Sequence, residues 1–137
     1  MPTHWRVSTH VTIQRPTTVA LRSSLYEDAA QIVAHEYQEE LSLDDIARRV
    51  ASSRRQLQRA FSEVGNTTFR DQLTRVRMER AGELLASRGL TVREVAHRVG
   101  YRQPAQFAKA FRRHHGVAPS EFRARRAHRA VGGTLAA

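Results

Sequence analysis

The stretch Leu41–Phe61, LSLDDIARRVASSRRQLQRAF, returns in altered form at Leu90–Phe111, LTVREVAHRVGYRQPAQFAKAF. In each copy a short amphipathic segment is followed by a break and then by a second segment with one apolar face and one polar, mostly basic face. This arrangement is typical of a helix-turn-helix. The repeat therefore predicts two helix-turn-helix units in one small chain, and a pair of such units suggests DNA as the partner.

The composition describes a small globular chain without cysteine. A length of 137 residues with 40% hydrophobic content is sufficient to bury a core. The lack of thiols excludes disulfide frameworks, thiolate zinc sites and cysteine nucleophiles. No apolar run approaches the roughly 20 residues that span a membrane, and the N-terminus lacks the apolar segment of a signal peptide. We therefore expect a cytoplasmic protein with no membrane partner.

The net charge of +10 is distributed unevenly. Residues 1–40 contain few arginines and a small excess of acids, whereas the part that holds the repeat contains nearly all of the basic residues. Basic residues that displace counterions from phosphates supply affinity for nucleic acid without regard to sequence. Codon usage in a GC-rich genome would explain why almost every basic residue is arginine, but it would not explain the excess over acids. The charge therefore indicates a polyanionic partner.

Helix signals follow one another from Ser24 to Arg126. A hydroxyl residue precedes an acid or an amide by three positions, as at helix N-termini, in the pairs Ser24 and Glu27, Ser42 and Asp45, Ser53 and Gln56, Thr68 and Asp71, and Thr91 and Glu94. The apolar periodicity predicts helices at 25–38, 43–50, 54–64, 69–87, 92–99, 104–115 and 120–126. The predicted fold is all-α, with about seven helices in two helix-turn-helix subdomains that a long central helix joins.

The predicted organisation has five parts. A first helix-turn-helix subdomain covers 24–67, a linker helix 68–88 and a second subdomain 89–126. The tail 127–137 is expected to be disordered, since it offers little to pack. In the N-terminal arm, residues 1–23, apolar and polar residues alternate from Trp5 to Ile13 as in a strand. This arm is an edge strand of an absent domain, a dimer-pairing arm or a disordered tail, and we favour the tail because a lone strand is marginally stable.

The helix expected at 54–64 is the first candidate DNA-reading helix. Its apolar face comprises Leu57, Ala60, Phe61 and Val64. Its polar face comprises Arg54, Arg55, Gln58, Arg59 and Ser62. No acid lies among these polar residues, whereas a merely solvated face is more often mixed in sign. Arginine and glutamine form bidentate hydrogen bonds to guanine and adenine, so we interpret the three arginines and the glutamine as DNA-binding residues.

The helix expected at 104–115 is the second candidate, and it has fewer hydrogen-bond donors. One extra residue in the break aligns Arg55 with Ala105 and Gln58 with Ala108. Alanine can touch a thymine methyl group, but it cannot read a hydrogen-bonding edge. The remaining candidate readers are Gln103, Gln106 and Lys109, and the candidate phosphate contacts are Arg102, Arg112 and Arg113. We expect the first unit to discriminate between sequences and the second to contribute mainly positioning.

Metal and catalytic chemistry find little support in the sequence. His114 and His115 are adjacent, so on a helix they point about 100° apart, and no nearby acid or cysteine completes a ligand set. His114 is expected on the core side as a packed or capping residue. The chain contains no glycine-rich phosphate loop, nucleophile elbow or suitably paired carboxylates. We therefore expect no metal, no cofactor and no enzymatic activity.

Five motifs occur together in the repeat region: LSLDDIA at 41–47, LQRAF at 57–61, RVRMERA at 75–81, VREVAHRVGY at 92–101 and FAKAFRRHHGVAPSEFR at 107–123. In this combination the chain resembles the AraC/XylS family of bacterial transcription regulators over about residues 24–126. Asn66 stands where that family commonly has glycine, and asparagine tolerates a left-handed backbone.

The resemblance implies a monomeric DNA-binding unit that binds double-stranded promoter DNA and contacts RNA polymerase in the bacterial cytoplasm, in association with the nucleoid. It implies the base readers Arg55, Gln58, Arg59, Gln106 and Lys109. If both reading helices enter successive major grooves on one face of the DNA, their separation should be about 34 Å.

Two alternatives stay open at this point. The charge alone would suffice for an architectural DNA-binding protein without sequence preference. Many members of the family carry a ligand-sensing or dimerising domain before the DNA-binding unit, and residues 1–23 are too short for one. The chain is therefore expected to be either a short stand-alone regulator or a fragment of a longer one.

Overall fold

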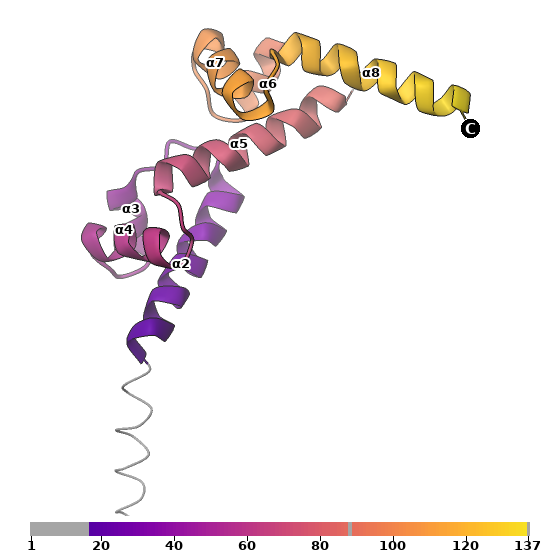
Figure 1. Ribbon diagram of the computed structural model, residues 1–137. Helices are drawn as coiled ribbons and strands as arrows, with labels where there is room; N and C mark the ends of the chain where they lie inside the picture. The colour runs from indigo at the N-terminus through magenta and orange to yellow at the C-terminus, as the bar shows by residue number, and fades with distance from the viewer. Residues whose placement is uncertain (1–16, 88, 137) are drawn as a thin grey trace, which may run out of the picture. The chain divides into compact units, whose positions relative to one another are not determined.

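The computed structural model describes residues 17–87 and 89–136, and within these ranges the chain forms seven helices and no strand (Figure 1). The helices are α2 (Thr17–Glu36), α3 (Leu43–Arg49), α4 (Arg54–Glu63), α5 (Phe69–Ala86), α6 (Val92–Arg98), α7 (Pro104–His115) and α8 (Pro119–Ala136). The prediction of an all-α chain with about seven helices is confirmed.

Three of the four helices of the repeated units, α3, α4 and α6, begin where hydroxyl side chains cap them. The hydroxyl of Ser42 accepts a hydrogen bond from the Asp45 amide, and that of Ser53 accepts one from the Gln56 amide. Thr91 and Glu94 form a complete capping box, in which each side chain bonds to the other residue's backbone amide. Three of the predicted caps are therefore confirmed, and α3, α4, α6 and α7 start at the predicted residues.

The first helix begins earlier than the sequence predicted. α2 starts at Thr17, so Ser24 lies inside the helix and does not cap it, and residues 17–23 are helical and are not part of an irregular arm. The spacing of Ser24 and Glu27 matches a capping box, but the same spacing also occurs within helices, and Ala20, Leu21 and Arg22 favour continuation. The strand-like alternation from Trp5 to Ile13 lies outside the described residues.

The last helix continues beyond its predicted end. α8 extends to Ala136, whereas the sequence predicted a helix ending at 126 and a disordered tail at 127–137. Arg125 pairs with Glu121 one turn earlier at 2.9 Å inside the predicted part of the helix. Ala127, His128 and Arg129 are all exposed, so the helix propensity of alanine and arginine, rather than packing, favours its continuation past residue 126.

The chain divides into two compact units. The first comprises the residues up to Val33 together with Leu41–Phe69, and the second comprises Ala34–Glu40 together with the residues from Arg70 onward. The sequence predicted a separate linker helix at 68–88, whereas in the structure α5 belongs to the second unit from Arg70 onward.

The core of the first unit lies between α2, α3 and α4. It contains the buried residues Ala29, Val33, Leu43, Ile46, Ala47, Leu57, Ala60 and Phe61. The ring of Phe61 meets Tyr26 edge to face at a centroid distance of 5.5 Å. Gly65 lets the chain pass close to the same tyrosine, because a Cβ atom there would lie 2.3 Å from the Tyr26 ring. These contacts fix α4 against α2, with its opposite face exposed.

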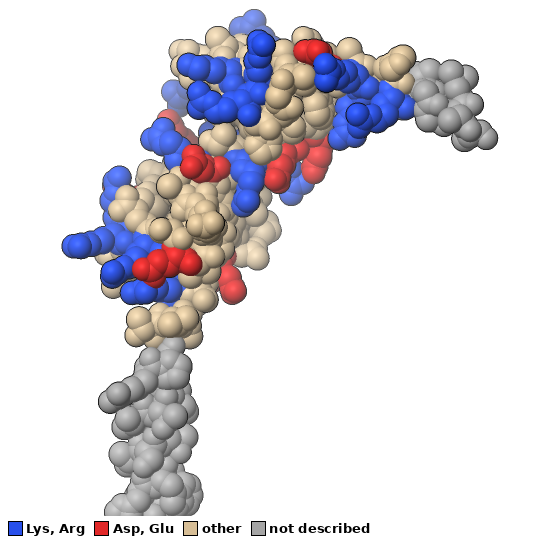
Figure 2. Space-filling view, viewed as in Figure 1, with Lys and Arg blue, Asp and Glu red and all other residues tan. Residues whose placement is uncertain are grey.

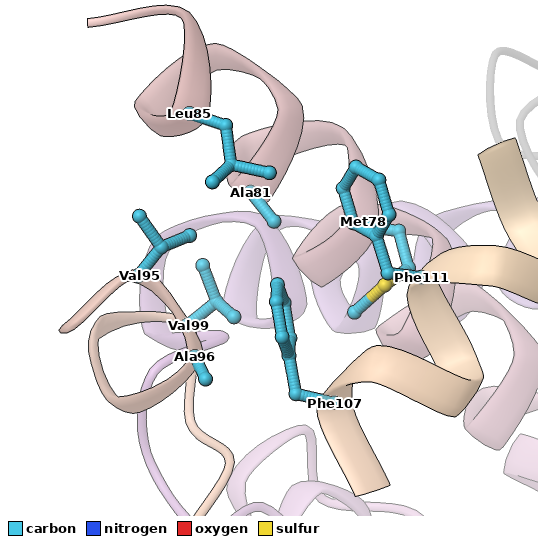
Figure 3. Packing of buried hydrophobic residues seen from close by; sticks show 8 residues of the cluster. All are labelled: Met78, Ala81, Leu85, Val95, Ala96, Val99, Phe107 and Phe111. Carbon is cyan, nitrogen blue, oxygen red and sulfur yellow. The ribbon is translucent and has the colours of Figure 1, made fainter. Parts of the chain in front are cut away.

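The core of the second unit is formed by α5, α6 and α7. Figure 3 shows Phe107 and Phe111 from α7 meeting Met78, Ala81 and Leu85 from α5 and Val95, Ala96 and Val99 from α6. His115 closes this core on one side: its ring lies 4.2 Å from that of Phe111, and its Nε2–H donates to the Met78 carbonyl at 2.9 Å. The burial of these side chains orients α7.

A half-buried arginine holds the segment Ala34–Glu40 within the second unit. Arg77 donates hydrogen bonds to the carbonyls of Tyr37 at 2.7 Å and Glu39 at 2.9 Å. Its guanidinium also lies over the Tyr101 ring, 5.6 Å from the centroid. Burial lowers the pKa of Arg77, while Tyr101 raises it in part. The contact joins the segment after α2 to the turn after α6.

The turns inside the two repeats share one backbone conformation. Ala51 has a φ of 54° and Gly100, its counterpart in the second copy, has a φ of 101°. A left-handed backbone ends the first helix of each unit so that the chain can enter the second. Asn66 also has a positive φ, 52°, as expected for a residue that replaces glycine.

Among the described residues, no helix combines the length and the apolar character needed to cross a membrane.

Candidate nucleic-acid interface

The polar face of α4 is exposed along its whole length. Leu57, Ala60 and Phe61 are fully buried and anchor the helix. The predicted reading residues Arg54, Arg55, Gln58 and Arg59 are all exposed on the other side. Figure 2 shows Lys and Arg side chains gathered over α3 and α4. The structure thus brings the four residues of the first unit together on one surface, and their contact with DNA stays a prediction.

Two acids flank this surface, although no acid lies among the polar residues predicted for the face of α4. Arg54 pairs with Asp44 of α3 at 3.3 Å, and Arg59 pairs with Glu63 of α4 at 3.4 Å. In contrast, Arg55 has no ion-pair or hydrogen-bond partner within residues 17–87 and 89–129. The middle of the reading face therefore offers unengaged donors, and its two ends are partly neutralised.

The exposed face of α7 carries fewer hydrogen-bonding groups than that of α4. Pro104 occupies the first helical position, and Gln103 at the N-cap makes no capping bond with its side chain. The exposed candidate residues are Gln103, Gln106, Lys109, Arg112 and Arg113. Ala105 is exposed as well, whereas Ala108 is half-buried. Figure 2 shows blue side chains over α7. The predicted inequality of donors between the two helices therefore also holds for their exposed surfaces.

The turn between α6 and α7 forms a basic pocket. Its lining includes Arg93, His97, Arg98 and Arg102 together with one acid, Glu94, and with Pro104, the first residue of α7. Arg102 lies 3.4 Å from Glu40, with both side chains largely exposed. An ion pair this exposed contributes little stability, so Arg102 can exchange its carboxylate partner for another anion. The pocket and the start of α7 together offer positive charge beside the second reading face.

The prediction that His114 lies on the core side of α7 is wrong. His115, not His114, packs against the core, and His114 is exposed. Partial burial is the main cause of a lowered pKa at His114; His115 and Arg75 lower the pKa further and Glu79 raises it. Neighbouring residues on a helix point about 100° apart, so the two rings face different sides, and the prediction assigned the core side to the wrong one. In the described part of the chain, no group of three or more potential ligands could hold a metal ion.

Three charged residues at this surface were not predicted from the sequence: Asp44, Glu63 and Arg22. Glu63 follows Arg59 by four positions, a spacing that predicts an ion pair on a helix. Asp44 lies in the first turn of α3, ten positions before Arg54, and local spacing does not predict that pair. Arg22 of α2 bonds to Glu63 across 41 positions of sequence, and no local signal could have predicted that contact.

The arrangement suits recognition rather than catalysis. Each unit presents a helix whose outer face carries arginine, glutamine or lysine, side chains that can donate hydrogen bonds to base edges or phosphates. The apolar faces of both helices are locked into separate cores, which holds these donors on rigid elements.

Comparison with known proteins agrees with this geometry. The model of a helix-turn-helix domain family matches residues 46–125. The Msm operon regulatory protein of Streptococcus mutans is 32% identical over 93 residues, which make up 68% of this chain and 34% of that protein. The chain spans about a third of the length of such curated relatives.

Solved structures extend the match to the fold. One is a transcriptional regulator from Chromobacterium violaceum that contains an AraC-type DNA-binding domain. It matches with a TM-score of 0.72 and 30% identity, and the match covers 79% of this chain and 96% of that one. The DNA-binding domain of AdpA, solved in complex with a target DNA, has a TM-score of 0.70 and 31% identity, covering 77% and 94%. These are DNA-binding domains and not enzymes. The chain described here belongs to the same family, that of the AraC-type helix-turn-helix DNA-binding domains.

Proposed function

We propose that this chain is a sequence-specific regulator of transcription that binds double-stranded promoter DNA through α4 and α7. The observation that carries the proposal is the exposed face of α4, where Arg55 and Gln58 have no ion-pair or hydrogen-bond partner among the described side chains, opposite the fully buried Leu57, Ala60 and Phe61. An arginine and a glutamine one turn apart can read guanine and adenine in the major groove. The AdpA domain, solved in complex with a target DNA, supports DNA as the partner.

The two helices divide the work unequally in this proposal. Arg55, Gln58 and Arg59 read bases, with Arg54 at the start of the same face. On α7, Gln106 and Lys109 read bases, with Gln103 as a further candidate, and Arg102, Arg112 and Arg113 hold phosphates. Because one chain carries both helices, it binds two successive major grooves as a monomer, with reading helices about 34 Å apart.

The regulatory outcome is transmitted to RNA polymerase at the promoter, in the cytoplasm and in association with the nucleoid. Operon regulation in the name of the Streptococcus mutans relative supports a promoter as the target. The same DNA-binding role applies whether the chain acts alone or as part of a longer regulator.

An architectural DNA-binding role without sequence preference is the second candidate, and the net charge of +10 favours it. Selection of bound sequences from a random duplex pool separates the two. The proposal predicts two enriched half-sites with centres about 10 base pairs apart, the one under α4 being the more restricted. A pool that shows no enrichment after repeated selection would favour the architectural role.

A further inference from the structure

Glu63 stands between two arginines of different kinds. Its Oε1 lies 3.4 Å from Nε of Arg59, a candidate base reader on α4. Its Oε2 lies 2.5 Å from Nη1 of Arg22, which belongs to α2 and is not part of the reading face. The Arg22 side chain is only 32% exposed, whereas that of Arg59 is 62% exposed. One partner of the carboxylate is therefore close and partly enclosed, and the other is looser and faces solvent.

This difference allows Arg59 to leave without isolating the carboxylate. If Arg59 turns toward DNA, Glu63 keeps its shorter bond to Arg22. A carboxylate without that partner would repel the phosphates and would also attract Arg59 back. Asp44, at the other end of the face, pairs with Arg54, and no second cation shares its carboxylate among the described side chains.

We propose that Glu63 holds Arg59 on the surface of α4 until DNA binds, and that Arg22 is a positioning residue, which shares the Glu63 carboxylate and so lowers the cost of releasing Arg59. The inference rests on the proposed function. An exposed ion pair is weak, so a bidentate bond from Arg59 to guanine can replace it. Breaking the pair subtracts from the affinity for the selected site, and the bond from Arg22 to Glu63 keeps that loss small.

The Glu63→Gln variant tests the first half of the proposal. It preserves the shape of the side chain and removes the charge. Affinity for the selected site should rise about two- to five-fold, because Arg59 no longer has to leave a carboxylate when it binds DNA. Glu83→Gln is the matched control: Glu83 pairs with Arg80 at 3.2 Å on α5, which is not a reading helix, and its neutralisation should raise the affinity less than Glu63→Gln does.

Arg22→Gln tests the second half through a double-mutant cycle with Glu63→Gln. In the parent background it should lower affinity for the selected site about five-fold, because Glu63 loses its neutralising partner. In the Glu63→Gln background the same change should cost less than about two-fold, and Arg22→Lys should restore most of the affinity. Thermal unfolding of each variant separates these effects from loss of the fold.

Three results would decide against the proposal or its basis. An affinity for the selected site in Glu63→Gln no higher than that in Glu83→Gln would overturn the role of Glu63. An Arg22→Gln effect of the same size in both backgrounds would overturn the role of Arg22. A parent protein that fails to distinguish its selected site from a scrambled duplex would overturn the proposed function, and this inference with it.

Discussion

Arg77 donates a hydrogen bond from Nε to the carbonyl of Tyr37, 40 positions earlier in the chain, at 2.7 Å. A second bond to the Glu39 carbonyl and the approach to the Tyr101 ring complete its surroundings. The guanidinium is half-buried, so its desolvation has to be offset by these contacts. Arg77 thereby fastens the segment Ala34–Glu40 to the second unit.

Replacing Arg77 by alanine should lower the free energy of unfolding by about 2–3 kcal/mol, because two carbonyls lose a charged donor. Lysine should recover only part of the loss, since its single ammonium lacks the planar fork of the guanidinium. Urea titration followed by circular dichroism measures the change. Arg70→Ala is the control, because Arg70 is exposed and has no ion-pair or hydrogen-bond partner among the described side chains, and it should stay within about 0.5 kcal/mol of the parent.

The equivalent turns at Ala51 and Gly100 should respond to mutation in opposite directions. A Cβ at Gly100 would lie 3.0 Å from Cζ of Arg77 and 3.1 Å from the Gln38 carbonyl, at a φ of 101°. Gly100→Ala should therefore destabilise the protein by about 2 kcal/mol or more. Ala51→Gly relieves a left-handed alanine and should stabilise it by up to about 1 kcal/mol, the gain being reduced by the entropy of glycine. Thermal melting measures both changes in stability. Melting temperatures that shift in the same direction for both variants would contradict this account of the two turns.

Arg55 and Arg112 should differ in the kind of affinity they supply. Arg55→Ala should cost about 1–3 kcal/mol at the selected site and relax the preference at one base pair. Arg112→Ala should weaken binding to all sequences alike and reduce the slope of log affinity against log salt by about 1. Fluorescence anisotropy over a salt series measures both. If Arg55→Ala bound its site like the parent, the assignment of α4 as the discriminating helix would be wrong.

His114 should make stability depend on pH below neutrality. Its pKa in the folded protein is lowered from the ordinary value of 6.5, so the unfolded chain binds the proton more readily. The stability that the neutral ring permits is present above 6.5 and declines as the pH falls through that value. His114→Gln should therefore lose less stability than the parent between about pH 7.5 and 5.5. Equal losses in the two proteins would remove His114 as a contributor.

Local sequence signals predicted the parts of the fold that local forces determine. Ser42, Ser53 and Thr91 cap their helices through bonds to residues three positions away, so spacing alone was sufficient to place α3, α4 and α6. The same spacing at Ser24 predicted a helix start that the structure does not have, because α2 begins at Thr17 and continues through Ser24.

Contacts between distant residues could not be predicted in this way. Exposure of Arg55, Gln58 and Arg59 followed from helical periodicity, but the bond from Arg22 to Glu63 depends on how α2 packs against α4. The inward position of His115 depends likewise on Phe122 and on the Met78 carbonyl. The sequence therefore predicts which residues form the candidate interface, but it does not predict the ion pair between Arg22 and Glu63 beside it.

The central claim is that the chain recognises a particular DNA sequence through two unequal helices. Competition binding at one fixed salt concentration tests it most directly, with a duplex enriched from a random pool set against scrambled duplexes of equal length and composition. The account predicts that the enriched duplex binds at least about a thousand-fold more tightly, as specific DNA-binding proteins do. Equal affinity for enriched and scrambled duplexes would contradict it and would leave only charge-driven binding.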